Sequence, residues 1–400
     1  MVMLNATTGF VWGYVQGHLF LWKTTDGGQH WQRYPVDAAP LRDPGVNTPV
    51  VDFQSRQVGW IAWVDNGNHA STLHVLRTDD GGRDWTQSTQ RMPPVVFQLE
   101  QMDFLNQRDG WIRAMSWVGS MSGDPSILQT TNGGQSWHLV SAATGYVPNP
   151  QATPDALPAI AEAMPIIFTS PQQGWVAVGS YGPNDPQPTV YETITGGKRW
   201  LPHHLPVPPA FRKKNFSSQA YSPVFSGPDG TVLIQFVGST TAKDNTVVAE
   251  RTTDGGHTWR AEPPLAAPSQ SWGDVVPSFI NPNEGWVIGT NGAPFAQTTN
   301  GGQSWSRIPL TQSLKALLAY RYPNRQLNIV EHYRIKQLAM VTPKVGWMML
   351  QRGRPGSLNG GTITKFFKTT DGGRTWTAQR NPIEVTAAVD SERWSAAQKR

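Results

Sequence analysis

The stretch Thr24-Thr25-Asp26-Gly27-Gly28-Gln29-His30-Trp31 recurs along this 400-residue chain and decides its fold. Six near-copies end in tryptophan at positions 85, 137, 200, 259, 305 and 376, so successive copies lie 46 to 71 residues apart. Each copy begins with threonine and places a Gly-Gly pair, once preceded by Thr rather than Asp or Asn, three residues before the tryptophan. Such internal self-similarity is the signature of solenoids and propellers. The sequence therefore predicts one small unit repeated seven times.

A second short motif lies ahead of nearly every copy of the first. It is glycine followed by tryptophan and an alternating apolar segment, and it occurs at Gly59-Trp60, Gly110-Trp111, Gly174-Trp175, Gly285-Trp286 and Gly346-Trp347, with the variants Gly9-Phe10 and Gly230-Thr231. Two signatures in every unit make a chance repeat a poor explanation.

The unit around the third copy predicts four short strands separated by turn residues, at 101–104, 111–115, 126–129 and 137–140. Four short strands per repeat indicate an antiparallel propeller blade. We therefore expect an all-β, seven-bladed β-propeller with the repeated motif as the turn between strands three and four. The predicted blades are about 1–35, 48–89, 98–140, 163–203, 221–262, 275–308 and 337–379, in a single domain at 1–380 with a tail at 381–400.

The repeated motif has a mechanical explanation. Gly-Gly tolerates the positive φ of a tight reversal, and an Asp or Asn oxygen can accept hydrogen bonds from the turn amides. The Thr hydroxyl can join this network, and the Trp ring can lie between neighbouring blades. Because repeated acids serve repeated structure, we expect structural rather than catalytic roles for Asp26, Asp80, Asn132, Asp254, Asn300 and Asp371. Thr195 takes this place in the fourth copy.

The Thr-x-Asp-x-Gly-x-x-Trp pattern is similar to the Asp-box, or bacterial neuraminidase repeat. Its pairing with the Gly-Trp motif most resembles the photosystem II assembly and stability factor family of seven-bladed propellers, over residues 1 to about 380. The resemblance implies a non-enzymatic binding or assembly scaffold. In photosynthetic members it also implies a basic surface patch that engages a membrane-protein client. Long inserts in this chain depart from the compact family pattern.

Composition limits the classes of function. The chain has no cysteine, which removes disulfides, thiol nucleophiles and zinc-thiolate sites. The net charge of +5 and the pI near 9.4 point to anionic partners, with simple solubility as the alternative explanation. No apolar run approaches the about 20 residues that cross a bilayer. Because a strand is expected at residue 1, we expect that an export signal or anchor was trimmed from this chain and that the protein acts outside the cytoplasm.

The inserts predict a working surface. In an up-and-down blade, the loop between strands two and three and the connection to the next blade leave from the same end. The long segments 117–125, 141–165, 181–188, 203–223, 311–337 and 352–364 all fall at that end, while the connections at the opposite end are short. Binding concentrates on loops of rigid scaffolds, so we expect this long-loop face to bind the partner. Helical spacing is expected only near Leu314, Leu317 and Leu318.

Basic and aromatic residues gather on these inserts. The expected binding residues are Arg212, Lys213, Lys214, Tyr320, Arg321, Tyr322, Arg325, Arg334, Arg352 and Arg354. Arginine offers bidentate hydrogen bonds to carboxylates, which favours a protein client or an anionic polymer, in a membrane or cell-envelope setting. The alternative is that these are solvated loop charges that pair with nearby acids. We expect a monomer, with no nucleic-acid partner, cofactor or metal.

The competing class is a carbohydrate-active protein, either a glycosidase or sialidase-like enzyme or a lectin, that uses the same face. Loop aromatics such as Trp117 and Trp272 could stack on sugars. A sialidase needs a Tyr and a Glu that meet, but Tyr191 and Glu192 are neighbours on a strand and point to opposite faces. Other glycosidases need two carboxylates about 5 to 9.5 Å apart, and Asp244, Glu250, Asp274 and Glu331 are weak candidates. We expect no catalytic residues.

Overall fold

The computed structural model describes sixteen stretches of the chain, and the statements below apply to them. They are 1–15, 18–36, 48–66, 71–93, 95–116, 123–143, 151–158, 165–180, 187–209, 211–212, 216–238, 245–265, 274–290, 292–318, 333–353 and 362–383.

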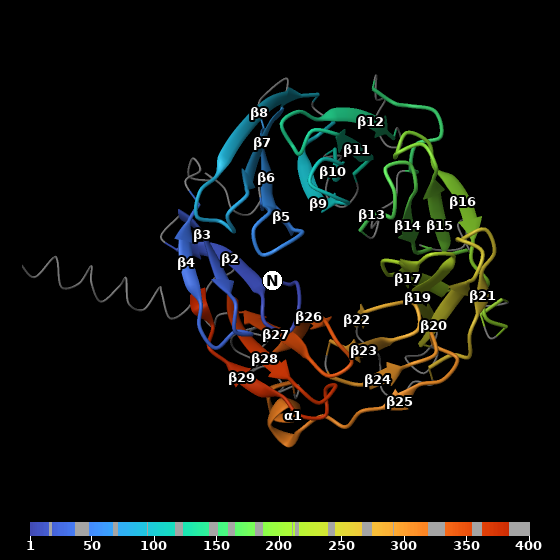
Figure 1. Cartoon of the computed structure of the whole chain (residues 1–400). Helices are drawn as coiled ribbons and strands as arrows, with labels where there is room; N and C mark the ends of the chain where they lie inside the picture. The colour runs from blue at the N-terminus through green and yellow to red at the C-terminus, as the bar shows by residue number, and fades with distance from the viewer. Residues whose placement is uncertain are drawn as a thin grey trace, which may run out of the picture. The chain divides into compact units, whose positions relative to one another are not determined.

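The described residues form seven antiparallel sheets, so the fold is the predicted all-β, seven-bladed propeller (Figure 1). Blades one to three comprise β1 (Val2–Met3), β2 (Gly9–Val15), β3 (His18–Thr24) and β4 (Gln32–Pro35); β5 (Val50–Phe53), β6 (Gly59–Asn66), β7 (Ser71–Thr78) and β8 (Thr86–Met92); and β9 (Gln98–Phe104), β10 (Gly110–Met115), β11 (Pro125–Thr130) and β12 (His138–Ala142). Blades four and five comprise β13 (Ile167–Phe168), β14 (Gly174–Val178), β15 (Thr189–Thr193) and β16 (Leu201–His204); and β17 (Phe216–Ala220), β18 (Val224–Ser226), β19 (Asp229–Gly238), β20 (Thr246–Thr252) and β21 (Arg260–Ala261). Blades six and seven comprise β22 (Val275–Phe279), β23 (Gly285–Gly289), β24 (Phe295–Thr298) and β25 (Ser306–Arg307); and β26 (Arg334–Met340), β27 (Gly346–Gly353), β28 (Thr362–Thr369) and β29 (Thr377–Gln379).

Blade five departs from the expected pattern. Its sheet begins with β17, ahead of the predicted start of the blade at residue 221, and β18 adds a fifth strand by pairing with β19. The other six blades have four strands each, in sequence order. Helix α1 (Gln312–Leu318) follows β25 where helical spacing was expected, and no helix among the described residues is long and apolar enough to span a membrane.

Contacts within the chain divide it into two compact units. One unit comprises Met1–Arg33, Gln235–Ala249 and Glu262–Arg400, and it holds blades one, six and seven with part of blade five. The other comprises Tyr34–Ile234 and Glu250–Ala261, and it holds blades two to four with the rest of blade five. The extent of the predicted domain, 1–380, stays a prediction.

The glycine of the Gly-Trp motif is required by the first strand of its own blade. Phe53 is the cross-strand partner of Gly59, and Phe104 is that of Gly110. In each pair a Cβ on the glycine would overlap the phenylalanine ring. The same close approach occurs at Gly174, Gly230 and Gly285 with phenylalanine, and at Gly9 and Gly346 with methionine. The phenylalanine or methionine side chain therefore takes the space that a Cβ on the glycine would fill.

The tryptophan of the same motif joins its blade to the next one. In one unit, Trp60 stacks on Phe104 with ring centroids 3.6 Å apart, and its indole N–H donates to the Gly133 carbonyl at 2.9 Å. Trp111 repeats both contacts one blade further, with Gly196 as the acceptor at 3.0 Å. In the other unit, Trp286 donates to the Gly372 carbonyl at 3.2 Å. Each acceptor is the first glycine of the next blade's Asp-box, so one motif binds the other.

Candidate binding site

The polar side chains of the Asp-box form hydrogen bonds within their own turn. The hydroxyl of Thr252 donates to the Asp254 carboxylate at 2.7 Å, and the N–H of Thr258 donates to it at 2.9 Å. Both glycines of this turn have positive φ, and the N–H of Gly256 donates to the Thr252 hydroxyl. Hydrogen bonds from the hydroxyl and N–H of Thr258 lower the pKa of Asp254, which fixes it as a carboxylate. The aspartates of the Asp-box therefore have a structural role.

The copies without aspartate make the same contact through other oxygens. Asn132 accepts from the N–H of Ser136 at 3.0 Å, and Asn300 accepts from that of Ser304 at 2.9 Å. The Thr195 hydroxyl accepts from the N–H of Arg199 at 3.0 Å. A neutral oxygen therefore suffices at this position, which argues against acid chemistry there.

Only part of the expected basic surface falls on described residues. Lys213, Lys214, Tyr320, Arg321, Tyr322, Arg325 and Arg354 lie outside them, as do Trp117, Trp272, Asp244 and Glu331. Arg212 is exposed and donates through Nε to the Val207 carbonyl at 3.0 Å, in a different unit from Arg334 and Arg352. Arg334 lies opposite Gln351, so Arg334 and Arg352 point to opposite faces of blade seven.

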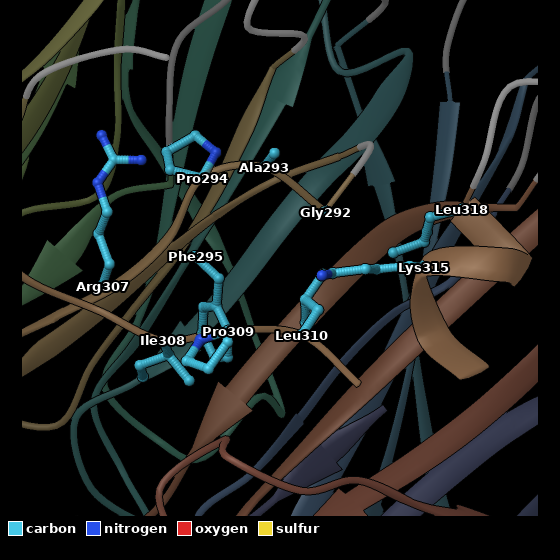
Figure 2. A pocket seen from close by; sticks show the side chains of 10 residues that line it. All are labelled: Gly292, Ala293, Pro294, Phe295, Arg307, Ile308, Pro309, Leu310, Lys315 and Leu318. Carbon is cyan, nitrogen blue, oxygen red and sulfur yellow. The ribbon is translucent and has the colours of Figure 1, made fainter. Parts of the chain in front are cut away.

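A pocket of about 530 Å³ lies at the long-loop end of blade six (Figure 2). We call it the blade-six pocket. The turn between β23 and β24, the segment after β25 and helix α1 form its walls, through Gly292, Ala293, Pro294, Phe295, Arg307, Ile308, Pro309, Leu310, Lys315 and Leu318. Eight of these ten residues are apolar or glycine, and the other two are the cations Arg307 and Lys315. The sequence reasoning had not singled out either cation.

Helix α1 is anchored by its apolar side. Leu314 and Leu318 are buried in the cluster that also holds Ile335 and Leu350 of blade seven. The N–H of Tyr333 donates to the Leu317 carbonyl at 3.2 Å, which ties the end of the helix to the start of β26. Lys315, by contrast, is exposed and lines the blade-six pocket. The helix therefore presents a cation to the pocket from a fixed position.

Two more cations flank the aromatic ring next to this helix. Tyr333 is only 5% exposed, and the Arg352 guanidinium lies 5.0 Å from its ring centroid. The Lys365 ammonium lies 5.6 Å from the same centroid. We call Lys315, Tyr333, Lys336, Arg352 and Lys365, together with the blade-six pocket, the α1 surface, and we include Arg334 at its edge, where it points to the other face of blade seven. Among the described residues, none of its five cations just named forms a salt bridge.

Comparisons with known proteins bear on this same region. Residues 237–317 match the family model described as photosynthesis system II assembly factor YCF48. The matched segment contains β20 and β21 of blade five and all four strands of blade six, and it includes most of α1 and nine of the ten pocket-lining residues. The family resemblance drawn from the two motifs is thus confirmed. No curated protein sequence matches the chain.

Solved structures are similar to this chain at low identity. YCF48 from Cyanidioschyzon merolae is 14% identical, with 85% of this chain and 87% of that chain covered and a TM-score of 0.48. A polysaccharide lyase of family PL25, an ulvan lyase, is 10% identical, with 97% and 99% covered and a TM-score of 0.54. An α-L-arabinanase from Penicillium chrysogenum is 11% identical, with 82% and 94% covered and a TM-score of 0.45. Such likeness concerns the fold alone.

The enzyme candidates take ordinary structural positions. Glu192 is buried and accepts from the Gln173 amide, while Tyr191 lies on the other face of β15. Glu250 is fully buried in β20. His203 and His204, expected in a loop, lie on strand β16 instead, where the sheet register pairs them with Val190 and Thr189. Among the described residues, no three His, Cys, Asp or Glu side chains are placed to hold a metal ion.

Sequence reasoning missed one pair of carboxyl groups. Asp52 on β5 accepts from the N–H of Phe104 at 2.9 Å, and Asp103 on β9 accepts from the N–H of Phe168 at 3.2 Å. Burial raises the pKa of Asp52 to about 6. Burial and the nearby Asp52 charge raise the pKa of Asp103 to about 7. The signal that could have found them is an aspartate directly before the phenylalanine that faces the Gly-Trp motif, which occurs at Asp52-Phe53 and Asp103-Phe104.

Proposed function

We propose that this protein is a non-enzymatic binding scaffold of the assembly-factor type that acts outside the cytoplasm. It engages an acidic protein client or an anionic polymer through its long-loop end. The family match at 237–317 supports a scaffold role. The observation that carries the proposal is the α1 surface, where the apolar blade-six pocket lies beside Lys315, Arg352 and Lys365, none of which forms a salt bridge with another described residue.

Charge and exposure make this surface suited to an anionic partner. Arg334, Lys336 and Lys365 are exposed, and the cation–π contacts of Arg352 and Lys365 hold both charges beside one ring. Like charges held together repel each other, and an incoming carboxylate relieves that repulsion. Charge-assisted hydrogen bonds to carboxylates are also stronger than neutral ones.

Charge reversal tests this proposal with poly-L-glutamate as the probe. Changing Arg334, Lys336 and Lys365 to glutamate together should weaken binding at least tenfold at low salt, as measured by biolayer interferometry. The matched control reverses Lys198, Lys344 and Arg374, three exposed cations at the opposite ends of their blades. The control changes the net charge equally and should bind nearly as wild type. Equal losses in both triple variants would mean that net charge alone attracts the probe.

The carbohydrate-active alternative keeps one specific observation. Asp52 and Asp103 belong to adjacent blades of one unit, interact electrostatically and have raised pKa values, which are features of acid–base pairs. Each also accepts a hydrogen bond from the backbone of the next blade, at Phe104 and Phe168, so a structural role in joining the blades explains them equally well. A screen of chromogenic glycosides and uronic-acid polysaccharides decides between the two. Hydrolysis or lyase activity that Asp103→Asn abolishes would establish the alternative.

A further inference from the structure

We infer that His203 of blade four and His257 of blade five together bind one divalent transition-metal ion of the Zn²⁺ type, and that this ion holds the two blades together. Glu192, on the strand next to His203, orients the first of these two ligands. All three residues belong to the same compact unit of the chain. The inference goes beyond the proposed function, because it concerns how two blades are joined and not which client the protein binds.

The joint between blades four and five lacks contacts that other joints have. Trp111 donates its indole N–H to the next Asp-box, whereas the indole N–H of Trp175 has no hydrogen-bond partner among the described residues. In blade two the residue directly before the box threonine, Arg77, also donates to a backbone carbonyl of blade three at 3.1 Å. In blade four this position is Glu192, the only acid among the seven copies, and a carboxylate cannot donate. The joint also has free space, since a Cβ on Gly255 would meet no described atom within 4 Å.

Glu192 fixes the orientation of His203. The carboxylate is buried, the Gln173 amide donates to one of its oxygens at 3.0 Å, and Nε2 of His203 lies 3.1 Å from the other. Because a carboxylate only accepts hydrogen bonds, the proton of the neutral ring is assigned to Nε2, and Nδ1 keeps its lone pair. Carboxylate–histidine pairs of this kind orient the histidine ligands of metal sites. No hydrogen bond to a described residue occupies Nδ1 of His203.

His257 supplies a second imidazole from the box turn of blade five. Its side chain is exposed, and its ring centroid lies 6.3 Å from that of His203, with 68° between the ring planes. Zn–N bonds of about 2.0–2.1 Å place two imidazoles on one ion with their centroids about 5–6 Å apart. Because His257 is exposed, a small rotation of its side chain closes the difference without moving a packed strand.

The groups around the two rings specify the kind of ion. Imidazole nitrogen suits Zn²⁺, Cu²⁺ and Ni²⁺, whereas Mg²⁺ and Ca²⁺ prefer oxygen ligands. Glu192 contacts one ring, and the Asp254 carboxylate interacts electrostatically with His257, so two carboxylates favour a cation here. Three protein ligands are not placed around one point among the described residues, so water completes the coordination. We therefore expect a weaker affinity than that of a structural zinc site with four protein ligands.

Isothermal titration calorimetry of the chelator-treated and dialysed protein with ZnCl₂ tests the site. Wild-type protein should bind about one Zn²⁺ ion per chain at the strongest site, and Zn²⁺ should raise its unfolding temperature, since an ion that binds only the folded state stabilises it. Mg²⁺ and Ca²⁺ should do neither. The electron paramagnetic resonance spectrum of bound Cu²⁺ gives a second readout and should show two nitrogen ligands.

Three variants and one control separate the ligands from the orienting carboxylate. His203→Ala and His257→Ala should each weaken Zn²⁺ binding at least about tenfold and remove the shift in unfolding temperature; His257 is exposed, so this variant keeps the fold. Glu192→Gln keeps both imidazoles and should weaken binding by about tenfold. His138→Ala, at an exposed histidine on β12, is the matched control and should bind Zn²⁺ as wild type does.

The results that would overturn the inference are distinct from those that bear on the client. Zn²⁺ binding that survives unchanged in both His203→Ala and His257→Ala would place the ion at other histidines of the chain. No Zn²⁺ binding by the wild-type protein would reject the site. If Zn²⁺ bound through both histidines without raising the unfolding temperature, the ion would not hold the blades together. None of these results depends on poly-L-glutamate binding, which tests the proposed function separately.

Discussion

At the scale of single residues, the carboxyl groups of this chain fall into two electrostatic classes. The box acids are held ionised: the backbone N–H of His30 lowers the pKa of Asp26 to about 2. Asp52 and Asp103 behave oppositely, because burial disfavours their charged forms. The first class stabilises turns, and the second lies where one blade meets the next.

The second class predicts a pH dependence of stability. Asp103 has a folded pKa of about 7, above its ordinary value of 3.8, so the folded state binds its proton more tightly than the unfolded state does. The resulting stability is complete below the unfolded pKa and is lost as the pH rises through about 7. Asp52 adds the same effect near pH 6. The midpoint temperature of thermal unfolding of the wild-type protein should therefore decrease as the pH rises from 5 to 8.

Asp103→Asn tests this dependence. Asparagine keeps an oxygen that can accept from the N–H of Phe168, but it cannot ionise. The decrease of the unfolding temperature between pH 5 and pH 8 should therefore become smaller. A pKa shift of one unit corresponds to about 1.4 kcal/mol of free energy of unfolding. Because Asp103 is in partial contact with solvent, we expect Asp103→Asn to raise the free energy of unfolding at pH 8 by about 1 kcal/mol. Thermal melts over this range measure it. The box acids do not interfere, since lowered pKa values act only near pH 4 and below. An unchanged slope would remove Asp103 as the cause.

At the scale of elements, the Gly-Trp strand and the Asp-box turn form one joint between consecutive blades. The strand supplies a stacked indole and its N–H, and the next turn supplies a carbonyl. Trp175 is an exception within the series. It stacks on Phe225 with centroids 4.0 Å apart, yet its buried indole N–H has no hydrogen-bond partner among the described residues. The chain therefore contains the same joint with and without its hydrogen bond.

Two substitutions exploit this difference. Trp111→Phe keeps an aromatic ring against Phe168 but removes the donor to Gly196, and it should lower the free energy of unfolding by about 1–3 kcal/mol. Trp175→Phe is the matched control, because it removes a donor that has no acceptor among the described residues. It should lower the free energy of unfolding less than Trp111→Phe does, or even raise it. Urea denaturation followed by circular dichroism measures both. If both variants lost the same free energy of unfolding, the volume of the ring and not the hydrogen bond would determine the stability of the joint.

At the scale of the whole molecule, the beginning and the end of the described chain belong to the same compact unit. The Gln337 amide donates to the Met1 carbonyl at 2.8 Å, and the Ile383 side chain contacts Gly13. Here the joint between blades seven and one replaces tryptophan with lysine as the donor. Lys368 donates to the Gly27 carbonyl at 2.9 Å, while the indole N–H of Trp347 has no hydrogen-bond partner in the part of the chain that the structure describes.

Because Lys368 is the donor at this joint, a mutation of Lys368 tests how the two ends of the chain are held together. Lys368→Met keeps an unbranched apolar stem but loses the hydrogen bond to Gly27 and the cation over the Trp347 ring, whose centroid is 5.0 Å away. We expect a loss of about 1–2 kcal/mol and faster cleavage at both ends of the chain in limited proteolysis. Lys344→Met, at an exposed site in the same blade, should change neither. Unaltered proteolysis in Lys368→Met would show that strand pairing alone retains the ends.

Much of the fold could be predicted because its determinants are local. The Asp-box reverses the chain through contacts between residues at most four positions apart, such as Thr24, Asp26 and His30. The phenylalanine or methionine over each of these glycines is nearly as local, five or six residues earlier, but this contact was not predicted. The extra strand β18 and the strand position of His203 and His204 were missed, since sheet pairing overrides the turn-like composition there.

The sequence by itself determined the number of blades, the turn that closes each one and the positive charge of the chain, because each depends on composition or on contacts between near neighbours. Only the tertiary structure decided where that charge meets an apolar pocket. Arg307, Lys315 and Leu318 come from a strand and a helix, while Tyr333, Arg352 and Lys365 come from three places in the next blade. Packing of α1 against blade seven brings them together, and no spacing in the sequence encodes that contact.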